Sequence, residues 1–155
     1  MLQPRPIDLA APDLYINREI SFLEFNRRVL AQAVDPRTPL LERLRFLTIC
    51  STNLDEFFEI RVAGLKQQIL LDLVQAGPDG LSPRQVLDAV SLEAHELVAE
   101  QYRILSEELL PALGHEGIRV LRRDDWTPNH QRWVRSTFQR EVLRVLSPMG
   151  LDPAH

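Results

Sequence analysis

Apolar side chains recur at intervals of three and four residues over most of this chain, and this spacing limits the fold more than any other feature. It places the apolar residues on one face of an α-helix, whereas a half-buried strand would need strict alternation. Short turns rich in proline and glycine interrupt the pattern at residues 35–39 and 75–80. Because short connections favour antiparallel neighbours, the sequence predicts a mainly α fold, an antiparallel and spectrin-like helical bundle.

Capping sequences mark the starts of four helices. Three of them have the spacing of a capping box, in which a side chain at each end satisfies a backbone N–H of the first turn. The fourth combines a threonine cap with proline at the first helical position. We therefore expect helices that start at Ser21, Thr38, Thr52 and Ser82, and that reach about residues 34, 48, 73 and 110.

The pattern changes after Pro111 and Gly114, which are expected to end the fourth helix. Residues 118–121 are rich in β-branched side chains, and Thr127 should cap one more helix that runs to about residue 145. The prolines of residues 1–13 favour an extended tail. We thus expect a tail at 1–13, a helical domain at 14–112 and an incomplete α/β segment at 113–155, where a second domain begins and is cut short.

Composition excludes several classes of protein. A formal net charge of −4 argues against a free-standing binder of polyanions, so any such site must be local. No stretch approaches the roughly 20 apolar residues that cross a bilayer, and the N-terminus lacks the apolar core of a secretion signal. The single cysteine, Cys50, is expected to be buried and structural, which fits a reducing compartment. The predicted location is the cytoplasm.

The residue pattern does not predict a catalytic site or a metal site, although several residues are candidates for one. The four histidines are scattered without ligand spacing, and no phosphate-binding loop of the P-loop type is present. The carboxylates after Asn53 have a simpler explanation than a metal site, since acidic residues stabilise the start of a helix. Several basic residues could face phosphate, although solvated helix faces explain most such charges. These candidates are His95, His115, His130 and His155; Asp55, Glu56 and Glu59; and Arg43, Arg45, Arg61 and Lys66.

Several long motifs resemble the large bacterial polyphosphate kinases, in the same order and spacing. The first is YINREISFLEFNRRVL at residues 15–30. It is followed by PLLERLRFL at 39–47, STNLDEFF at 51–58 and RVAGL at 61–65. The final residues, LSPMGLDPAH at 146–155, are also similar to that family. The resemblance spans nearly everything after residue 13.

The resemblance implies a function for a longer protein. Members of this family transfer the terminal phosphate of ATP reversibly to polyphosphate through a phosphohistidine, with Mg²⁺, and they form homodimers. Their active site lies in two C-terminal domains, so this chain would hold only the helical N-terminal domain and the start of the head domain. We expect it to be inactive alone, to hold no catalytic residue or Mg²⁺ ligand, and to contribute subunit packing and an adenine-side contact.

The resemblance also implies a nucleotide contact at Asn53, whose amide offers the donor and acceptor that match adenine. Phe46, on the preceding helix, is expected to offer a face for the ring. Alternatively, Asn53 only caps the third helix, as asparagine does in many proteins. A further alternative for the whole chain is a small, non-enzymatic helical interaction module whose apolar seams bind a partner.

Overall fold

The computed structural model describes residues 8–72 and 76–147. Within these residues the chain forms helices and connecting loops and contains no strand, so the predicted mainly α fold is confirmed. Two compact units are present, Met1–Ile118 and Arg119–His155, and each is described by itself. None of the described helices combines the length and the apolar character needed to cross a membrane.

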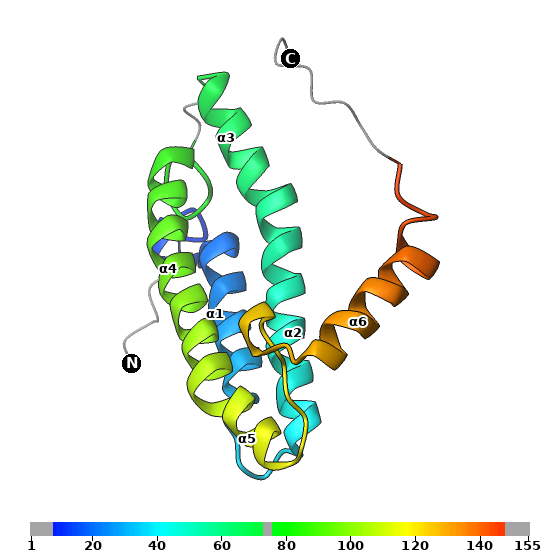
Figure 1. Cartoon of the computed structure of the whole chain (residues 1–155). Coiled ribbons are helices and arrows are strands. Elements are labelled where there is room, and N and C mark those ends of the chain that lie inside the picture. Colours follow the sequence, from blue (N-terminus) through cyan, green and yellow to red (C-terminus); the bar gives the residue numbers. More distant parts are fainter. Residues whose placement is uncertain (1–7, 73–75, 148–155) are drawn as a thin grey trace. The chain divides into compact units, whose positions relative to one another are not determined.

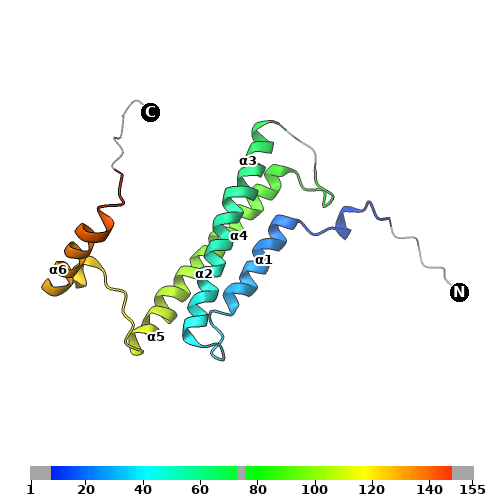
Figure 2. The same ribbon diagram turned by 90° about the vertical axis from the view of Figure 1, so that its right-hand side faces the viewer.

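The described part of the first unit is a bundle of three helical rods, preceded by the short 3-10 helix η1 (Pro12–Leu14). Helix α1 (Arg18–Ala31) is the first rod. The second joins α2 (Leu40–Glu56) through the π-helical segment η2 (Phe57–Val62) to α3 (Ala63–Leu70). The third joins α4 (Pro83–Arg103) through the π-helical segment η3 (Ile104–Leu109) to α5 (Leu110–His115). Successive rods run side by side in opposite directions, which confirms the antiparallel bundle (Figures 1 and 2).

The expected helix start at Thr52 is wrong, because α2 passes through Thr52 and Asn53 without a break. Leu47 and Leu54 both point into the core, so the apolar stripe continues across the polar residues between them. The Thr52 hydroxyl donates to the carbonyl of Thr48 at 3.1 Å, a bond that lets threonine remain inside a helix. The capping-box spacing was therefore coincidental, and two expected helices are one rod.

The first helix also starts earlier than expected, at Asn17 instead of Ser21. The Oδ1 atom of Asn17 accepts from the backbone N–H of Glu19 at 3.0 Å and of Ile20 at 3.1 Å. The Nδ2 atom of the same side chain donates to Asp79 at 2.6 Å, which ties the helix start to the loop before α4. Asn17 thus combines a cap with a tertiary contact that local sequence does not reveal.

The other expected boundaries have mixed outcomes. Ser82 caps α4 in a complete capping box with Gln85, as predicted. Thr38 makes no cap, and α2 starts directly after Pro39. The third rod continues to His115 instead of ending before Pro111. Pro111, which has no backbone N–H, is the second residue of α5 and lies two positions after the end of η3.

Both π-helical segments of the first unit occur where the buried stripe takes a step of five residues. The steps are Phe57 to Val62 in the second rod and Ile104 to Leu109 in the third, and all four side chains are buried. Five residues of α-helix overshoot a full turn by about 140°, which would turn the stripe away from the core. A π-helical turn bonds each residue to the fifth along the chain and absorbs the extra residue. The stripe therefore stays directed at the core.

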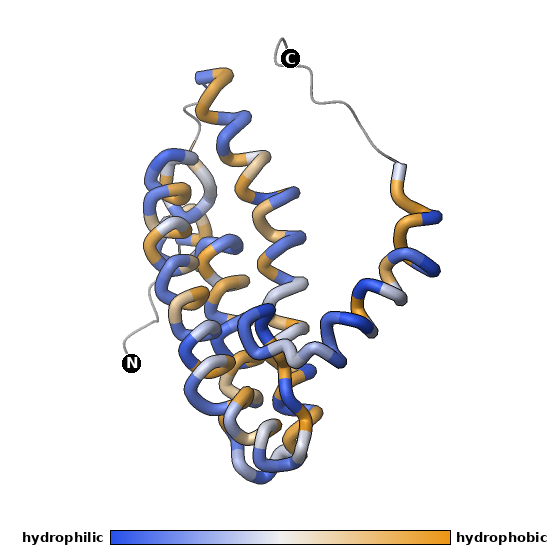
Figure 3. Tube along the Cα trace, in the orientation of Figure 1, coloured by the Kyte–Doolittle hydropathy of each residue, from blue (hydrophilic) through white to orange (hydrophobic). Residues whose placement is uncertain are grey.

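The core of the first unit is apolar except at two positions. Apolar residues recur along each helix (Figure 3), and the most buried lie where the rods meet. Two polar side chains are buried among them, Asn26 on α1 and Gln101 on α4. The largest fully buried side chains are Phe57, Leu23, Leu97, Leu109, Val90, Asn26 and Cys50.

Charged contacts join α1 to α4 at the edge of this core. Arg27 donates to the carboxylates of Glu93 at 2.7 Å and Glu96 at 3.2 Å. The hydrogen bond that Arg27 donates to Glu93 raises the pKa of Arg27 above its usual value, so this guanidinium stays charged. Arg43, considered above as a phosphate contact, instead donates to the carbonyl of Ala33 at 2.6 Å and holds the loop after α1.

The second unit contains a 3-10 turn, η4 (Arg123–Asp125), then α6 (Pro128–Thr137) and the π-helical segment η5 (Phe138–Val142). Thr127 caps α6 as predicted, with His130 as the capping-box partner. Residues 118–121, rich in β-branched side chains, form neither helix nor strand. Trp133 is 67% exposed.

Some expectations fall outside the described residues. They concern residues 1–7 of the expected tail and residues 148–155, including His155. Of the remaining expected tail, residues 12 and 13 belong to η1.

Replacing the Asn17 cap should destabilise the bundle. Asn17→Ala removes two capping bonds and the bond to Asp79, so we expect a loss of about 1–2 kcal/mol in the free energy of unfolding. Ser21→Ala, at the start predicted from sequence, should change it by less than about 0.5 kcal/mol. Urea denaturation followed by circular dichroism compares the two; a larger loss for Ser21→Ala would contradict the helix start at Asn17.

The thiol of Cys50 should be unreactive while the bundle is folded. Its side chain is fully buried, and burial raises its pKa to about 11. Since the thiolate is the reactive form, roughly a hundredfold fewer thiolates are present at pH 8 than for an exposed cysteine, before access is considered. Reaction with a disulfide reagent, followed in buffer and in denaturant, checks this. Because Cys50 is the chain's single cysteine, fast labelling of the folded protein would contradict its burial.

Candidate functional site

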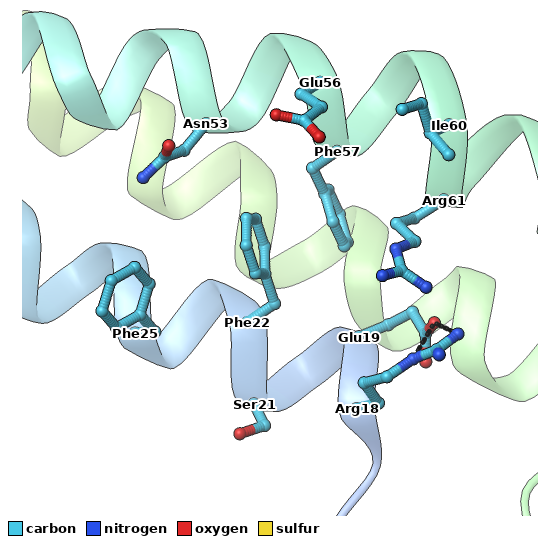
Figure 4. A pocket seen from close by; sticks show the side chains of 10 residues that line it. All are labelled: Arg18, Glu19, Ser21, Phe22, Phe25, Asn53, Glu56, Phe57, Ile60 and Arg61. Atoms are coloured by element: carbon cyan, nitrogen blue, oxygen red, sulfur yellow. Dashed lines mark hydrogen bonds and ion pairs between the residues drawn. The ribbon is translucent and has the colours of Figure 1, made fainter.

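A pocket of about 430 Å³ lies between α1 and the junction of α2 with η2 (Figure 4). The two helices that form it are held together by the apolar core beneath. Its lining combines aromatic, charged and amide side chains within one cavity. The α1 residues that line it are Arg18, Glu19, Ser21, Phe22 and Phe25, and the residues from the second rod are Asn53, Glu56, Phe57, Ile60 and Arg61.

Aromatic rings form one wall of this pocket. Phe22 stacks on the buried Phe57, with ring centroids 5.2 Å apart and planes 12° from parallel. Phe25 lies one helical turn further along α1, 6.3 Å from Phe22, and remains 46% exposed. The buried stack holds Phe22 in place, whereas the Phe25 ring stays partly exposed and has the guanidinium of Arg28 6.0 Å from its centroid. Offset stacking of this kind is the usual way that proteins hold flat aromatic groups.

The opposite end of the pocket is charged. Arg18 makes an ion pair with Glu19 at 3.0 Å, and Arg61 reaches toward this pair from η2 (Figure 4). Among the described residues Arg61 makes no ion pair of its own within 4 Å, and its side chain is exposed. A guanidinium group in this position can donate two hydrogen bonds to a carboxylate or a phosphate.

Asn53 links the pocket to the core. Its Nδ2 atom donates to Oδ1 of the fully buried Asn26 at 2.9 Å. One of the two N–H donors of this amide is therefore used within the bundle, which leaves the other N–H and the Oδ1 acceptor for a ligand. The alternative in which Asn53 caps a helix is wrong, since Asn53 lies inside α2, fourteen residues into its seventeen.

The structure does not bring Phe46 to this pocket. Phe46 lies seven residues before Asn53 on α2, about 10 Å along the helix axis, and packs against the core. The rings near Asn53 are those of Phe22 and Phe25. The three-residue spacing of these rings is visible in the sequence. A core residue and a pocket residue on a helix have the same spacing, however, so the sequence did not indicate that these two rings line a pocket.

The remaining candidates lie elsewhere or have structural roles. His95 and His115 lie on α4 and at the end of α5, and His130 completes the cap of α6. Of the carboxylates considered, Glu56 lines the pocket, whereas Asp55 and Glu59 are exposed outside it. The described residues contain no group of three or more histidine, cysteine or carboxylate side chains placed to hold a metal ion.

Comparisons with known proteins agree on one family. The model of the polyphosphate kinase N-terminal domain matches residues 15–121. A polyphosphate kinase of Pseudomonas aeruginosa is 56% identical over 142 residues, which cover 92% of this chain and 21% of that protein. A polyphosphate kinase of Thermosynechococcus vestitus is 50% identical over 152 residues, covering 98% and 21%. The chain thus spans about a fifth of the length of these relatives.

A solved structure gives the same result. The crystal structure of polyphosphate kinase from Porphyromonas gingivalis superposes with a TM-score of 0.64 at 34% identity, covering 88% of this chain and 19% of that one. The family model covers more than half of the chain, and it includes all three rods and every residue that lines the pocket. This chain belongs to the polyphosphate kinase family, in which it corresponds to the N-terminal domain and the residues that directly follow it.

Proposed function

We propose that this chain forms the adenine side of the ATP site in a polyphosphate kinase, which transfers the terminal phosphate of ATP reversibly to polyphosphate through a phosphohistidine. The observation that carries the proposal is the position of Asn53, whose amide lies in the same pocket as the exposed ring of Phe25. An amide beside an aromatic face suits a flat heterocycle with polar edges. The cavity of about 430 Å³ falls within the usual size range of ligand pockets.

The bond to Asn26 fixes how the Asn53 amide can meet adenine. One N–H of Nδ2 is held by Asn26, so Oδ1 keeps one orientation, in which it accepts from the 6-amino group, while the second N–H remains for a ring nitrogen. Phe25 stacks on the ring and Ile60 adds apolar contact. In this arrangement the aromatic part of the pocket binds the base. The charged end, with Arg18 and Arg61, then contacts the sugar or the phosphates.

The energy of these contacts makes the isolated chain a weak binder. One amide–base contact contributes about 1–3 kcal/mol, whereas millimolar affinity already requires about 4 kcal/mol. In the proposal, most of the ATP affinity, the phosphorylated histidine and the residues that hold Mg²⁺ with the phosphates lie outside this chain. The chain alone is then inactive. Homodimer formation, implied by the family resemblance, stays a prediction.

Removing the amide of Asn53 should weaken ATP binding by the protein that the complete reading frame encodes. We expect Asn53→Ala to raise the Kd for ATP about 5- to 150-fold, the range that corresponds to 1–3 kcal/mol. Thr52→Ala, a neighbouring exposed position outside the pocket, is the matched control and should leave the Kd unchanged. Calorimetric titration measures both. Equal affinity of Asn53→Ala and the parent would remove the nucleotide role and favour the interaction module.

The ring of Phe25 should contribute separately. Stacking of a base on an aromatic side chain contributes about 1–3 kcal/mol, so Phe25→Ala should raise the Kd for ATP at least fivefold. Phe58→Ala removes an exposed ring of comparable accessibility that lies outside this pocket and should have no effect. The same titration compares them, with thermal unfolding to show that both variants are folded. Loss of affinity in Phe58→Ala alone would place the base elsewhere.

A further inference from the structure

We propose that Asn26 is a positioning residue: it holds the amide of Asn53 in one orientation, with its nitrogen toward α1, and so makes the site prefer a 6-aminopurine to a 6-oxopurine. This inference rests on the proposed function of Asn53. Asn26 is a buried residue of α1 that does not line the pocket, yet it would control which purine the pocket accepts.

The first support is the burial of Asn26. Its side chain has no exposed surface, and its Oδ1 accepts from Nδ2 of Asn53 at 2.9 Å across the α1–α2 contact. Its Nδ2 atom is buried with no hydrogen-bond partner. Gln101, the other buried polar side chain among the described residues, does find a partner, donating to the carbonyl of Leu47 at 3.3 Å.

An unsatisfied amide in an apolar core costs folding free energy, and an apolar side chain of similar size would avoid that cost. Asn26 lies among the most buried residues of the molecule, next to the core residues Leu23 and Leu30 of the same helix face. The core therefore gives no reason for an asparagine here. The hydrogen bond that the side chain does make is directed at Asn53, the amide of the pocket.

Fixing this amide matters because its two ends are similar in size and opposite in chemistry. A free asparagine can turn by half a revolution about its last side-chain bond, which exchanges the oxygen and the nitrogen. With Nδ2 of Asn53 bonded to Asn26, the oxygen stays on the other side; in Figure 4 the nitrogen points toward α1 and the oxygen away from it. Reversing the pair requires both amides to turn together, one of them in a close-packed core.

The orientation determines which purine is accepted. Adenine carries an amino donor at position 6, which suits an oxygen acceptor, whereas hypoxanthine and guanine carry an oxo acceptor there. An Asn53 released from Asn26 can present Nδ2 to the oxo group as readily as it presents Oδ1 to the amino group. Loss of Asn26 should therefore reduce the preference for adenine while binding itself persists.

The test compares Kd values for ATP and inosine triphosphate, measured calorimetrically on the protein that the complete reading frame encodes. We expect Asn26→Leu to lower the ratio of ITP to ATP Kd at least fivefold, and Asn26→Ala to do the same if leucine is not accommodated. Gln101→Leu, a buried polar residue away from the pocket, is the matched control and should leave the ratio unchanged. A general loss of packing weakens both nucleotides alike, so the ratio separates positioning from stability.

The double variant separates the two proposals. In an Asn53→Ala background, Asn26→Leu should have no further effect on the ratio, because the amide to be oriented is gone. An unchanged ratio in Asn26→Leu and Asn26→Ala, with weaker ATP binding in Asn53→Ala, would overturn the positioning role and leave the adenine contact in place. Unchanged ATP binding in Asn53→Ala would overturn both.

Discussion

The bundle depends on one geometric constraint: two long helical rods must keep a single apolar stripe directed at a common core over about thirty residues each. An ideal α-helix meets this constraint only while the buried positions follow steps of three and four. Both rods break that pattern once, and both relieve it with a π-helical turn at the same step of five residues. The rods are therefore continuous where a purely α-helical chain would have to bend, unwind or expose its core.

The same constraint also shapes the candidate site. In η2, Phe57 belongs to the core, while Ile60 and Arg61 line the pocket with residues of α1. π-Helical turns are frequent at functional sites because they displace side chains from the regular helical positions. Core and pocket share the Phe22–Phe57 stack and the Asn26–Asn53 bond. The wall of this pocket is thus not an addition to the bundle surface but the outer side of its packing.

Much of this arrangement was predictable from local sequence, and the failures share a cause. The capping box at Ser82 is satisfied within one turn, so sequence alone identified it. Asn17, by contrast, caps α1 through local bonds, but it also contacts Asp79, sixty-two residues away, and that contact has no local signature. The helix start predicted at Thr52 was wrong because small polar residues occur both at helix caps and inside helices. Only the apolar stripe, which continues past Thr52, distinguishes the two cases. Family resemblance drew attention to Asn53 as a candidate, but its buried partner Asn26 became visible only in the three-dimensional packing.

The position of Asn53 inside a continuous helix has a consequence for how this domain can vary. From Leu40 onward each residue advances the helix by about 100°, so deleting or inserting one residue between residues 40 and 52 would swing the amide away from α1 and out of the pocket. The loops at 32–39 and 76–82 do not set the rotation of a side chain about a helix axis, so their length can change at little cost in free energy. Length differences among related chains should therefore accumulate in the loops, while the stretch from Leu40 to Asn53 keeps a constant number of residues.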